Sequence, residues 1–196
     1  DLHSFPTRRS SDLLILSLLT STDLNSQEVV VPIDVQMQLF FKIISFDRNF
    51  KSRIKNNITI NIVYQKKFRN SLNALNEVLS FFDKNMNYRS FEGFNVVVKP
   101  LAIESENDLK NYMTSNLNDI YYICPMRAVN ISSISVHSKN NKILSFTGVQ
   151  EYVEEGISFG FGIKGDKPLI IINLETSKKI GADYSSQLLR LAKVIE

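Results

Sequence analysis

The sequence predicts an α/β fold in which helices cover both faces of a mostly parallel sheet. Between residues 33 and 147, segments with helical spacing of apolar residues alternate with short segments typical of strands, and this alternation favours a parallel sheet. Residues 157–172 instead indicate two strands around Gly165-Asp166, a pair typical of a hairpin turn. The 196 residues are 43% hydrophobic and 22% charged, which suits one globular domain. We therefore expect a Rossmann-like three-layer sandwich with a C-terminal β-hairpin and a terminal helix.

The first two thirds of the chain are expected to alternate between helix and strand. The first helix has apolar residues at 33, 37, 40, 41 and 44, which gives it one apolar face. In the first strand, Ile58, Ile60 and Ile62 occupy every second position. Pro100 and Pro125 are expected to end two later strands. The predicted elements are a helix over 33–48, a strand over 57–64, a helix over 67–84, a strand over 94–99, a helix over 105–116, a strand over 119–124, a weaker helix over 128–139 and a strand over 143–147.

The last third is expected to hold the hairpin and two capped helices. Strands are predicted over 157–164, where apolar and small or polar residues alternate, and over 169–172, which is continuously apolar. Asn173 can cap a short helix that ends at Gly181. Either serine of Ser185-Ser186 can cap a final helix. That helix would direct five apolar residues inward, namely Leu188, Leu189, Leu191, Ala192 and Ile195.

The first residues are interpreted as foreign to the protein. The string SFPTRRSSDL at positions 4–13 resembles a translated sequencing adapter, so residues 1–13 are expected to be an artefact joined to the gene. The alternative is a genuine twin-arginine or Sec signal, because Arg8-Arg9 precedes an apolar run over 13–19.

The apolar run itself predicts export. It is too short to span a membrane but has the character of the apolar region of a signal peptide. Residues 14–26 are therefore predicted to be the remnant of a secretory signal, and a short core strand or helix is the alternative. The mature chain is expected to form a single domain over 27–196, without stable insertion in a membrane.

Composition excludes several classes of function. The chain has 23 Lys and Arg against 20 Asp and Glu, a net charge of +3, and no dense basic block, which argues against nucleic-acid binding. The single cysteine excludes an intrachain disulfide and a multi-cysteine metal site. There are only two histidines. We therefore expect neither a cofactor nor a metal ion.

Two short patterns suggest chemistry but favour a structural interpretation. Gly160-Phe-Gly-Ile-Lys-Gly165 matches G-x-G-x-x-G, yet its first two glycines lie inside a predicted strand and its third leads into another strand. A dinucleotide site needs a helix to begin after these glycines. We therefore expect the glycines to allow a close approach of the backbone or a hairpin turn. His137 lies in a serine-rich helical stretch without an evident nucleophile or acid, so we interpret it as a surface or partly satisfied residue.

Cys124 and the basic residues each allow more than one interpretation. Cys124 ends a predicted strand, where open α/β sheets bind ligands, so it could be a nucleophile. A buried core residue is the favoured alternative, and pairing between chains is a third. The adjacent carboxylates of Glu154-Glu155 do not predict a glycosidase pair. Basic residues flanking the first strand are expected to form a solvated rim, or else to contact an acidic protein or anionic lipid; they are Arg48, Lys51, Arg53, Lys55, Lys66, Lys67 and Arg69.

The C-terminal stretch resembles a known family. Four motifs within residues 155–195 are similar in order and spacing to those of the YfiR-like family. Upstream, Met37–Arg48 and Asn57–Tyr64 lie where that family has its first helix and first strand, so the resemblance spans about residues 33–195 and is specific over 155–195. The motifs are Glu155-Gly-Ile-Ser-Phe159, Ile171-Ile-Asn-Leu174, Lys179-Ile-Gly181 and Ser185-Ser-Gln-Leu-Leu-Arg-Leu-Ala-Lys-Val-Ile195.

The resemblance implies a non-catalytic periplasmic regulator. Such a protein binds the periplasmic domain of a membrane-bound signalling protein, for example a diguanylate cyclase or a sensor kinase, and represses it. A homodimer is left open. One alternative is a periplasmic module that binds a small molecule at the strand ends, and another is an enzyme with Cys124 as its nucleophile.

This sequence departs from the family at positions that shape contacts. Well-known members carry cysteines in disulfides, whereas this chain has one cysteine. Their aromatic-acidic-Trp-Pro segment is replaced by Ser45-Phe-Asp-Arg48, and the chain has no Trp. No catalytic, cofactor-binding, metal-binding or partner-binding residue is therefore assigned from the resemblance.

Overall fold

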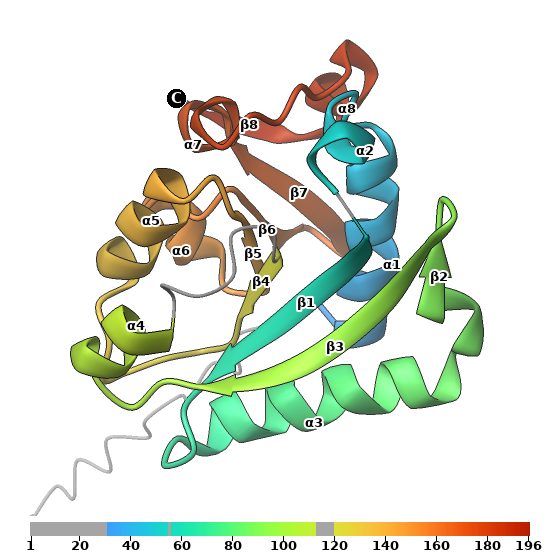
Figure 1. Cartoon of the computed structure of the whole chain (residues 1–196). Helices are drawn as coiled ribbons and strands as arrows, with labels where there is room; N and C mark the ends of the chain where they lie inside the picture. The colour runs from blue at the N-terminus through green and yellow to red at the C-terminus, as the bar shows by residue number, and fades with distance from the viewer. Residues whose placement is uncertain (1–30, 55, 113–119) are drawn as a thin grey trace, which may run out of the picture.

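The structure is a computed structural model that describes residues 31–54, 56–112 and 120–196. It shows one central sheet with helices on both faces, which confirms the predicted α/β sandwich (Figure 1). The strands are β1 Asn57–Tyr64, β2 Ser90–Phe91, β3 Phe94–Ala102, β4 Ile120–Ile123, β5 Leu144–Thr147, β6 Phe159–Lys164, β7 Lys167–Asn173 and β8 Lys193–Ile195. The helices are α1 Ile33–Ser45, α2 Phe50–Arg53, α3 Arg69–Lys84, α4 Glu106–Tyr112, α5 Ile131–Asn140, α6 Gln150–Glu154, α7 Leu174–Lys179 and α8 Ser186–Leu191, with the 3-10 helix η1 Met86–Arg89.

The sheet is mostly parallel, and its strand order reverses next to β1. The order is β2-β3-β1-β4-β5-β6-β7-β8. The five adjacent strands β3-β1-β4-β5-β6 are parallel to one another. Strand β2 pairs antiparallel with β3, and β7 pairs antiparallel with β6. The chain passes from β1 outward to β3 and then returns to β4 on the other side of β1. Open α/β sheets bind ligands at such a reversal, outside the carboxyl ends of the strands.

The hydrophobic core has two parts, one on each face of the sheet. On one face, α1 and α3 pack over Ile58, Ile60 and Ile62 of β1. On the other face, Val63 and Tyr121 meet α4 and α5. Because side chains of a strand point alternately to opposite faces, β1 supplies both parts of the core.

The hairpin and the helix caps that the sequence predicts are present. Lys164 pairs with Lys167 across the turn, and Gly165 has a φ of 60°. At the start of α7 the Asn173 side chain accepts a hydrogen bond from the Thr176 backbone N–H at 2.9 Å. The Ser185 hydroxyl likewise accepts from the Leu188 N–H at 3.3 Å at the start of α8. These caps need only residues three positions apart, so sequence alone can specify them.

The end of the chain differs from the prediction. The final helix was expected to include Ile195, but α8 ends at Leu191 and Ala192 has extended backbone angles. Residues 193–195 form β8, which pairs in parallel with β7. The open side of β7 offers backbone hydrogen bonds that a further helical turn would leave unused.

Two other boundaries differ for local reasons. Strand β3 continues through Pro100 to Ala102 instead of ending at the proline. Beyond Asn95 the outer side of β3 is not paired with β2, so a residue without an N–H is tolerated there. The first helix ends at Ser45 rather than residue 48, because the Asp47 carboxylate accepts a hydrogen bond from the Asn49 N–H at 3.0 Å in a turn. Strand β2 and helix α6 were not predicted.

Some expectations fall outside the described residues. These are the adapter interpretation of residues 1–13, the signal remnant over 14–26 and the last residues of the helix expected over 105–116. Within the described ranges, no helix combines the length and the apolar character that crossing a membrane requires.

Candidate functional site

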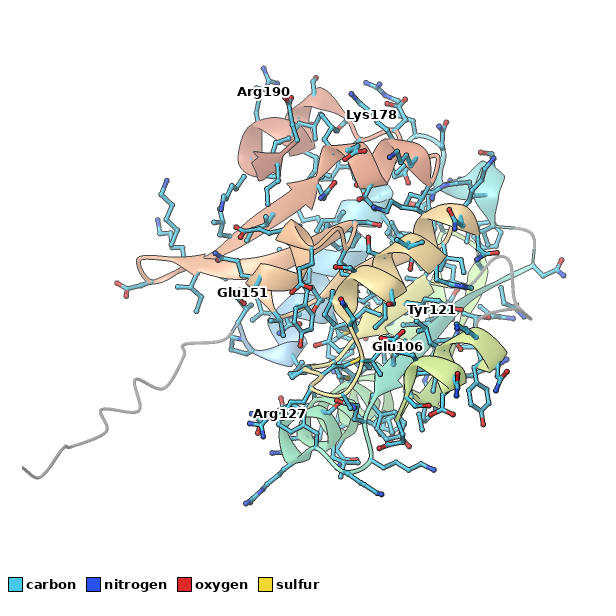
Figure 2. The ribbon with its side chains drawn as sticks, turned by 90° about the vertical axis from the view of Figure 1, so that its left-hand side faces the viewer. Glu106, Tyr121, Arg127, Glu151, Lys178 and Arg190 are labelled. Atoms are coloured by element: carbon cyan, nitrogen blue, oxygen red, sulfur yellow. The ribbon has the colours of Figure 1, made fainter. Side chains whose placement is uncertain are left out.

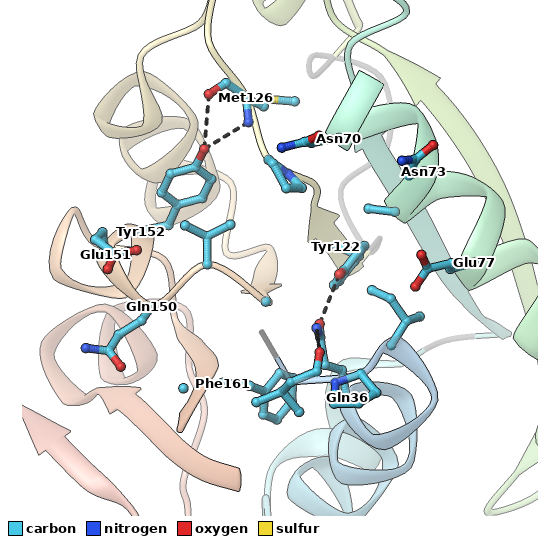
Figure 3. A pocket seen from close by; sticks show the side chains of 18 of the residues that line it. Gln36, Asn70, Asn73, Glu77, Tyr122, Met126, Gln150, Glu151, Tyr152 and Phe161 are labelled. Atoms are coloured by element: carbon cyan, nitrogen blue, oxygen red, sulfur yellow. Dashed lines mark hydrogen bonds between the residues drawn. The ribbon is translucent and has the colours of Figure 1, made fainter. Parts of the chain in front are cut away.

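A crevice of about 670 Å³ lies at the carboxyl ends of the parallel strands, where the strand order reverses. One wall is a face of α3, and the opposite wall is formed by the residues after β5, by α6 and by β6 (Figure 3). The segment after β4 forms the floor, and the start of α1 closes one side. The topology therefore places this cavity where this class of sheet binds ligands.

A buried pair of polar side chains joins the start of α1 to the floor of the crevice. The Tyr122 hydroxyl donates to Gln36 Oε1 at 2.9 Å, and Gln36 Nε2 donates to the Val31 carbonyl at 2.6 Å (Figure 3). Gln36 is 1% exposed. A Cβ atom on Gly148 would lie 2.5 Å from the Gln36 amide, so only glycine leaves this amide room. The pair holds the start of α1 against β4 at the edge of the crevice.

The segment after β4 is held in place by two further side chains. The Tyr152 hydroxyl accepts from the Met126 N–H at 2.8 Å and donates to the Met126 carbonyl at 3.2 Å. Gln65 directly follows β1, and its Oε1 atom accepts hydrogen bonds from the backbone N–H groups of Arg127 at 2.5 Å and Ala128 at 3.3 Å. Side chains rather than the sheet therefore satisfy the backbone N–H groups of residues 126–128.

The α3 wall carries polar side chains at helical spacing. Asn70, Asn73 and Glu77 all line the crevice, because positions three and four apart share a helix face. At the N-terminal end of this wall, the Arg127 guanidinium lies over the Phe68 ring, 4.4 Å from its centroid. In Figure 2, Arg127 lies beside the start of α3, and Glu151 lies toward the β6–β7 hairpin.

Burial controls the titration of the two tyrosines at the crevice. Burial raises the pKa of Tyr122 well above its usual value, and the nearby Cys124 and Glu77 add to the effect. Burial also raises the pKa of Tyr152, against a smaller opposing effect of its hydrogen bond with Met126. Both phenols are therefore neutral hydrogen-bonding groups near pH 7.

The glycine motif has the structural role that the sequence favoured. Gly160 and Gly162 lie within β6, and a Cβ atom on Gly160 would lie 2.9 Å from the Thr147 carbonyl oxygen. A Cβ atom on Gly162 would collide with the Gln150 side chain. These glycines allow β5, β6 and α6 to approach one another closely, and no helix begins after Gly165.

The candidate nucleophile and the histidine lie away from the crevice lining. Cys124 is fully buried in the core, which confirms the favoured interpretation, and burial raises the pKa of its thiol. His137 lies on α5, where its ring nitrogens are 3.1 and 3.3 Å from Asn141 Nδ2. Among the described residues, no cluster of three or more His, Cys, Asp or Glu side chains could hold a metal ion.

The basic residues near β1 separate into two groups. Arg48 and Lys51 form exposed ion pairs with Asp183 at 3.4 Å and with Glu92 at 2.7 Å, as expected of a solvated rim. Arg53 does not belong to this rim, because its guanidinium pairs with the fully buried carboxylate of Asp47. Lys55 lies outside the described residues, and Lys66, Lys67 and Arg69 are exposed.

Sequence analysis named the strand ends as a possible ligand site but none of the residues that build it. Gln36 comes from a helix that was identified only by its apolar face. The available signal was weak, namely a polar residue at an otherwise buried position of an amphipathic helix. Its partner Tyr122 lies 86 positions away, so spacing could not join them.

Comparison with solved structures supports the fold. An ABC domain in complex with L-Trp from Streptococcus pneumonia has 16% identity and a TM-score of 0.61, covering 84% of this chain and 62% of that chain. The ligand-free, open structure of a substrate binding protein with adhesive properties from Clostridium difficile has 18% identity and a TM-score of 0.60, covering 85% and 60%. A conserved domain protein from Vibrio cholerae has 13% identity and a TM-score of 0.59, covering 86% and 61%. This chain spans less than two thirds of each of them.

Comparison at the level of sequence is more specific. No curated protein matches the chain. A family model described as YfiR/HmsC-like matches residues 33–193, which extend from the first residue of α1 to the first residue of β8.

Proposed function

The chain belongs to the YfiR/HmsC-like family, and we propose that it is a periplasmic, non-catalytic regulator of a membrane-bound signalling protein. It binds the periplasmic domain of a diguanylate cyclase or a sensor kinase and represses it. The observation that carries the proposal is the family match, which includes nearly every described element.

The mechanism is a shift between two states of the partner. A regulator changes the activity of a receptor only if it binds one state more tightly than the other. Repression therefore requires preferential binding to the inactive state, and a tenfold preference corresponds to about 1.4 kcal/mol. No change within the regulator itself is needed.

The experiment begins with the gene's neighbours. If a gene for a membrane-bound cyclase or kinase lies adjacent, its purified periplasmic domain is immobilised, and binding of the full chain is measured by biolayer interferometry. Deletion of the regulator gene should raise cyclic di-GMP or kinase output, and complementation should restore it. The absence of binding together with unchanged output after deletion would refute the proposal.

A second candidate function is supported by the crevice. We infer that the protein also binds a small molecule there, because the cavity lies at the strand-order reversal and its buried Gln36–Tyr122 pair is already formed. A Trp at Asn73 would fill the crevice from the α3 wall, whereas Asn76 lies on the same helix outside the lining. A ligand found by thermal shift should therefore lose binding in Asn73→Trp and keep it in Asn76→Trp. Equal binding to both variants would place the ligand elsewhere.

A further inference from the structure

Four basic residues lie together at one end of the crevice, where β1 and β4 end. They are Lys66, Lys67 and Arg69 after β1 and Arg127 after β4, and we call them the basic cluster. Gln65 Oε1 accepts from the Arg127 N–H at 2.5 Å, across 62 positions of sequence. The Arg127 guanidinium lies 4.4 Å from the centroid of the Phe68 ring, and Figure 2 shows Arg127 beside the start of α3. The fold therefore gathers charges that are separate in sequence.

The positive charge of the basic cluster is largely uncompensated within the described residues. All four members are exposed, and none forms an ion pair with another described residue. The Glu104 carboxylate is near, where it accepts a hydrogen bond from the Lys66 backbone N–H at 2.5 Å. Four positive charges beside this carboxylate concentrate on one surface as much charge as the whole chain carries on balance, which is +3.

The Arg127 guanidinium is restrained while its hydrogen-bond donors stay free. A cation–π contact holds it against the Phe68 ring. No group among the described residues accepts a hydrogen bond from its side chain. A guanidinium in this condition is suited to bind a carboxylate through two parallel hydrogen bonds.

The other three members of the basic cluster lie where they weaken the fold. The N-terminal end of a helix is its positive end, so a positive side chain there is unfavourable. Helix α3 begins at Arg69, has no acidic residue in its first turn and has no side-chain cap. Residues that oppose local stability are expected chiefly at functional sites. Their placement therefore favours a role in binding over a role in folding.

The surroundings of the basic cluster suit a polypeptide better than a lipid bilayer. Binding to a bilayer requires an apolar side chain that can insert among the lipids. Phe68 is half-buried and its ring is in contact with Arg127, so it is not free to insert. The adjacent crevice instead offers space for side chains of a partner, with the carboxamides of Asn70 and Asn73 along its α3 wall.

We propose that the basic cluster docks an acidic segment of the partner's periplasmic domain, with one carboxylate of that segment on the Arg127 guanidinium. This proposal rests on the proposed regulatory function and adds the chemistry of the partner segment. Charges at the edge of an interface act mainly on the rate of association. Association should therefore slow as salt is raised.

The first test does not require the partner. The full chain labelled with ¹⁵N is titrated with acetylated hexaglutamate, and the backbone amide shifts are followed by NMR. Shifts should centre on residues 66–70 and 127–128 and should disappear at about 0.5 M NaCl. Lys164 and Lys167 are the internal control, because they are exposed lysines of the β6–β7 hairpin. Shifts centred on the hairpin would overturn the proposed surface.

The second test uses charge reversal and the periplasmic domain encoded by the neighbouring gene. Arg127→Glu and Arg69→Glu should each lower the rate constant of association about threefold at low salt, and the double variant about tenfold. Arg190→Glu changes the net charge equally at an exposed position on α8 and should associate like the wild type. Arg69→Glu should also raise Tm, because a negative charge at the start of α3 is favourable. Slower association in a more stable variant would exclude misfolding as the cause.

The possible failures are distinguishable. Association unchanged in the double variant would overturn the docking surface and leave the regulatory function intact. No binding of the neighbour's domain by the wild type would overturn the regulatory function, and the hexaglutamate shifts would then report on the acidic chemistry alone. Sedimentation of the chain with phosphatidylglycerol vesicles, without any hexaglutamate shift, would overturn the polypeptide in favour of a lipid headgroup.

Discussion

Replacing Asp47 with Ala should cost the protein a large part of its stability. The carboxylate of Asp47 is fully buried, and it pairs with the Arg53 guanidinium. It also accepts hydrogen bonds from the backbone N–H groups of Asn49 at 3.0 Å and Asp183 at 2.9 Å. One carboxylate therefore holds the α1–α2 turn against the segment before α8, across 136 positions of sequence.

The magnitude follows from what the substitution leaves behind. Removing one member of a buried ion pair costs about 3–5 kcal/mol, because the other charge stays buried without a counter-charge. Arg53 is 21% exposed, so water reaches part of its guanidinium and the lower end of that range applies. About 3 kcal/mol is a large share of a typical stability of about 5–15 kcal/mol. For a domain of this size it corresponds to a fall in Tm of about 6–12 °C.

The chain contains a matched control. Asp83 and Arg89 are also an aspartate and an arginine six positions apart, 3.0 Å from each other, but their side chains are 74% and 38% exposed. Exposed pairs contribute about 0–1 kcal/mol, so Asp83→Ala should shift Tm by no more than about 4 °C. Thermal and urea denaturation followed by circular dichroism measure both variants. If Asp47→Ala melted within the shift of Asp83→Ala, the argument from burial would be refuted.

Buried groups elsewhere give three further predictions. Burial raises the pKa of the Cys124 thiol, so the native protein at pH 8 should not react with a thiol reagent such as DTNB. The protein unfolded in urea should react fully, and rapid reaction of the native protein would contradict the prediction. Burial also raises the pKa of Tyr184 above the usual 10.0. The unfolded chain loses this proton before the folded chain does, so the free energy of unfolding should fall as pH rises above about 10, and less steeply in Tyr184→Phe; urea titrations from pH 8 to 11 check this. Gly160→Ala should destabilise the protein by about 1–3 kcal/mol, because its new Cβ would lie 2.9 Å from the Thr147 carbonyl oxygen, which cannot move freely. Gly162→Ala should cost less, because its Cβ meets chiefly the end of a flexible side chain, and equal losses in thermal denaturation would contradict the distinction.

The helices and strands were predictable where one face is buried along their whole length. The spacing of Ile58, Ile60 and Ile62 identified β1, because a strand with one buried face places apolar residues at every second position. The elements that sequence analysis missed are short. Strand β2 has two residues and β8 has three, too few for a periodic pattern. They exist because the sheet offers open edges at which backbone groups can pair.

The candidate site was predictable only in its position. Alternation of helix and strand implies a parallel sheet, and such sheets bind ligands at their carboxyl ends, so the general location followed. The polar lining did not, because Gln36 and Glu77 are ordinary helix residues in sequence. Each becomes part of a site only when strand order brings α1 and α3 to the end of β4.

The sequence by itself determined whatever depends on neighbouring residues. Helix caps at Asn173 and Ser185 join atoms three positions apart, and the turn at Gly165 needs only a residue that tolerates a positive φ. Only the tertiary structure decided the contacts between distant residues. The bond between Gln36 and Tyr122 and the burial of Asp47 join parts of the chain 86 and 136 positions apart. Their energy depends on the distance and the exclusion of water after folding, and no local pattern encodes either quantity.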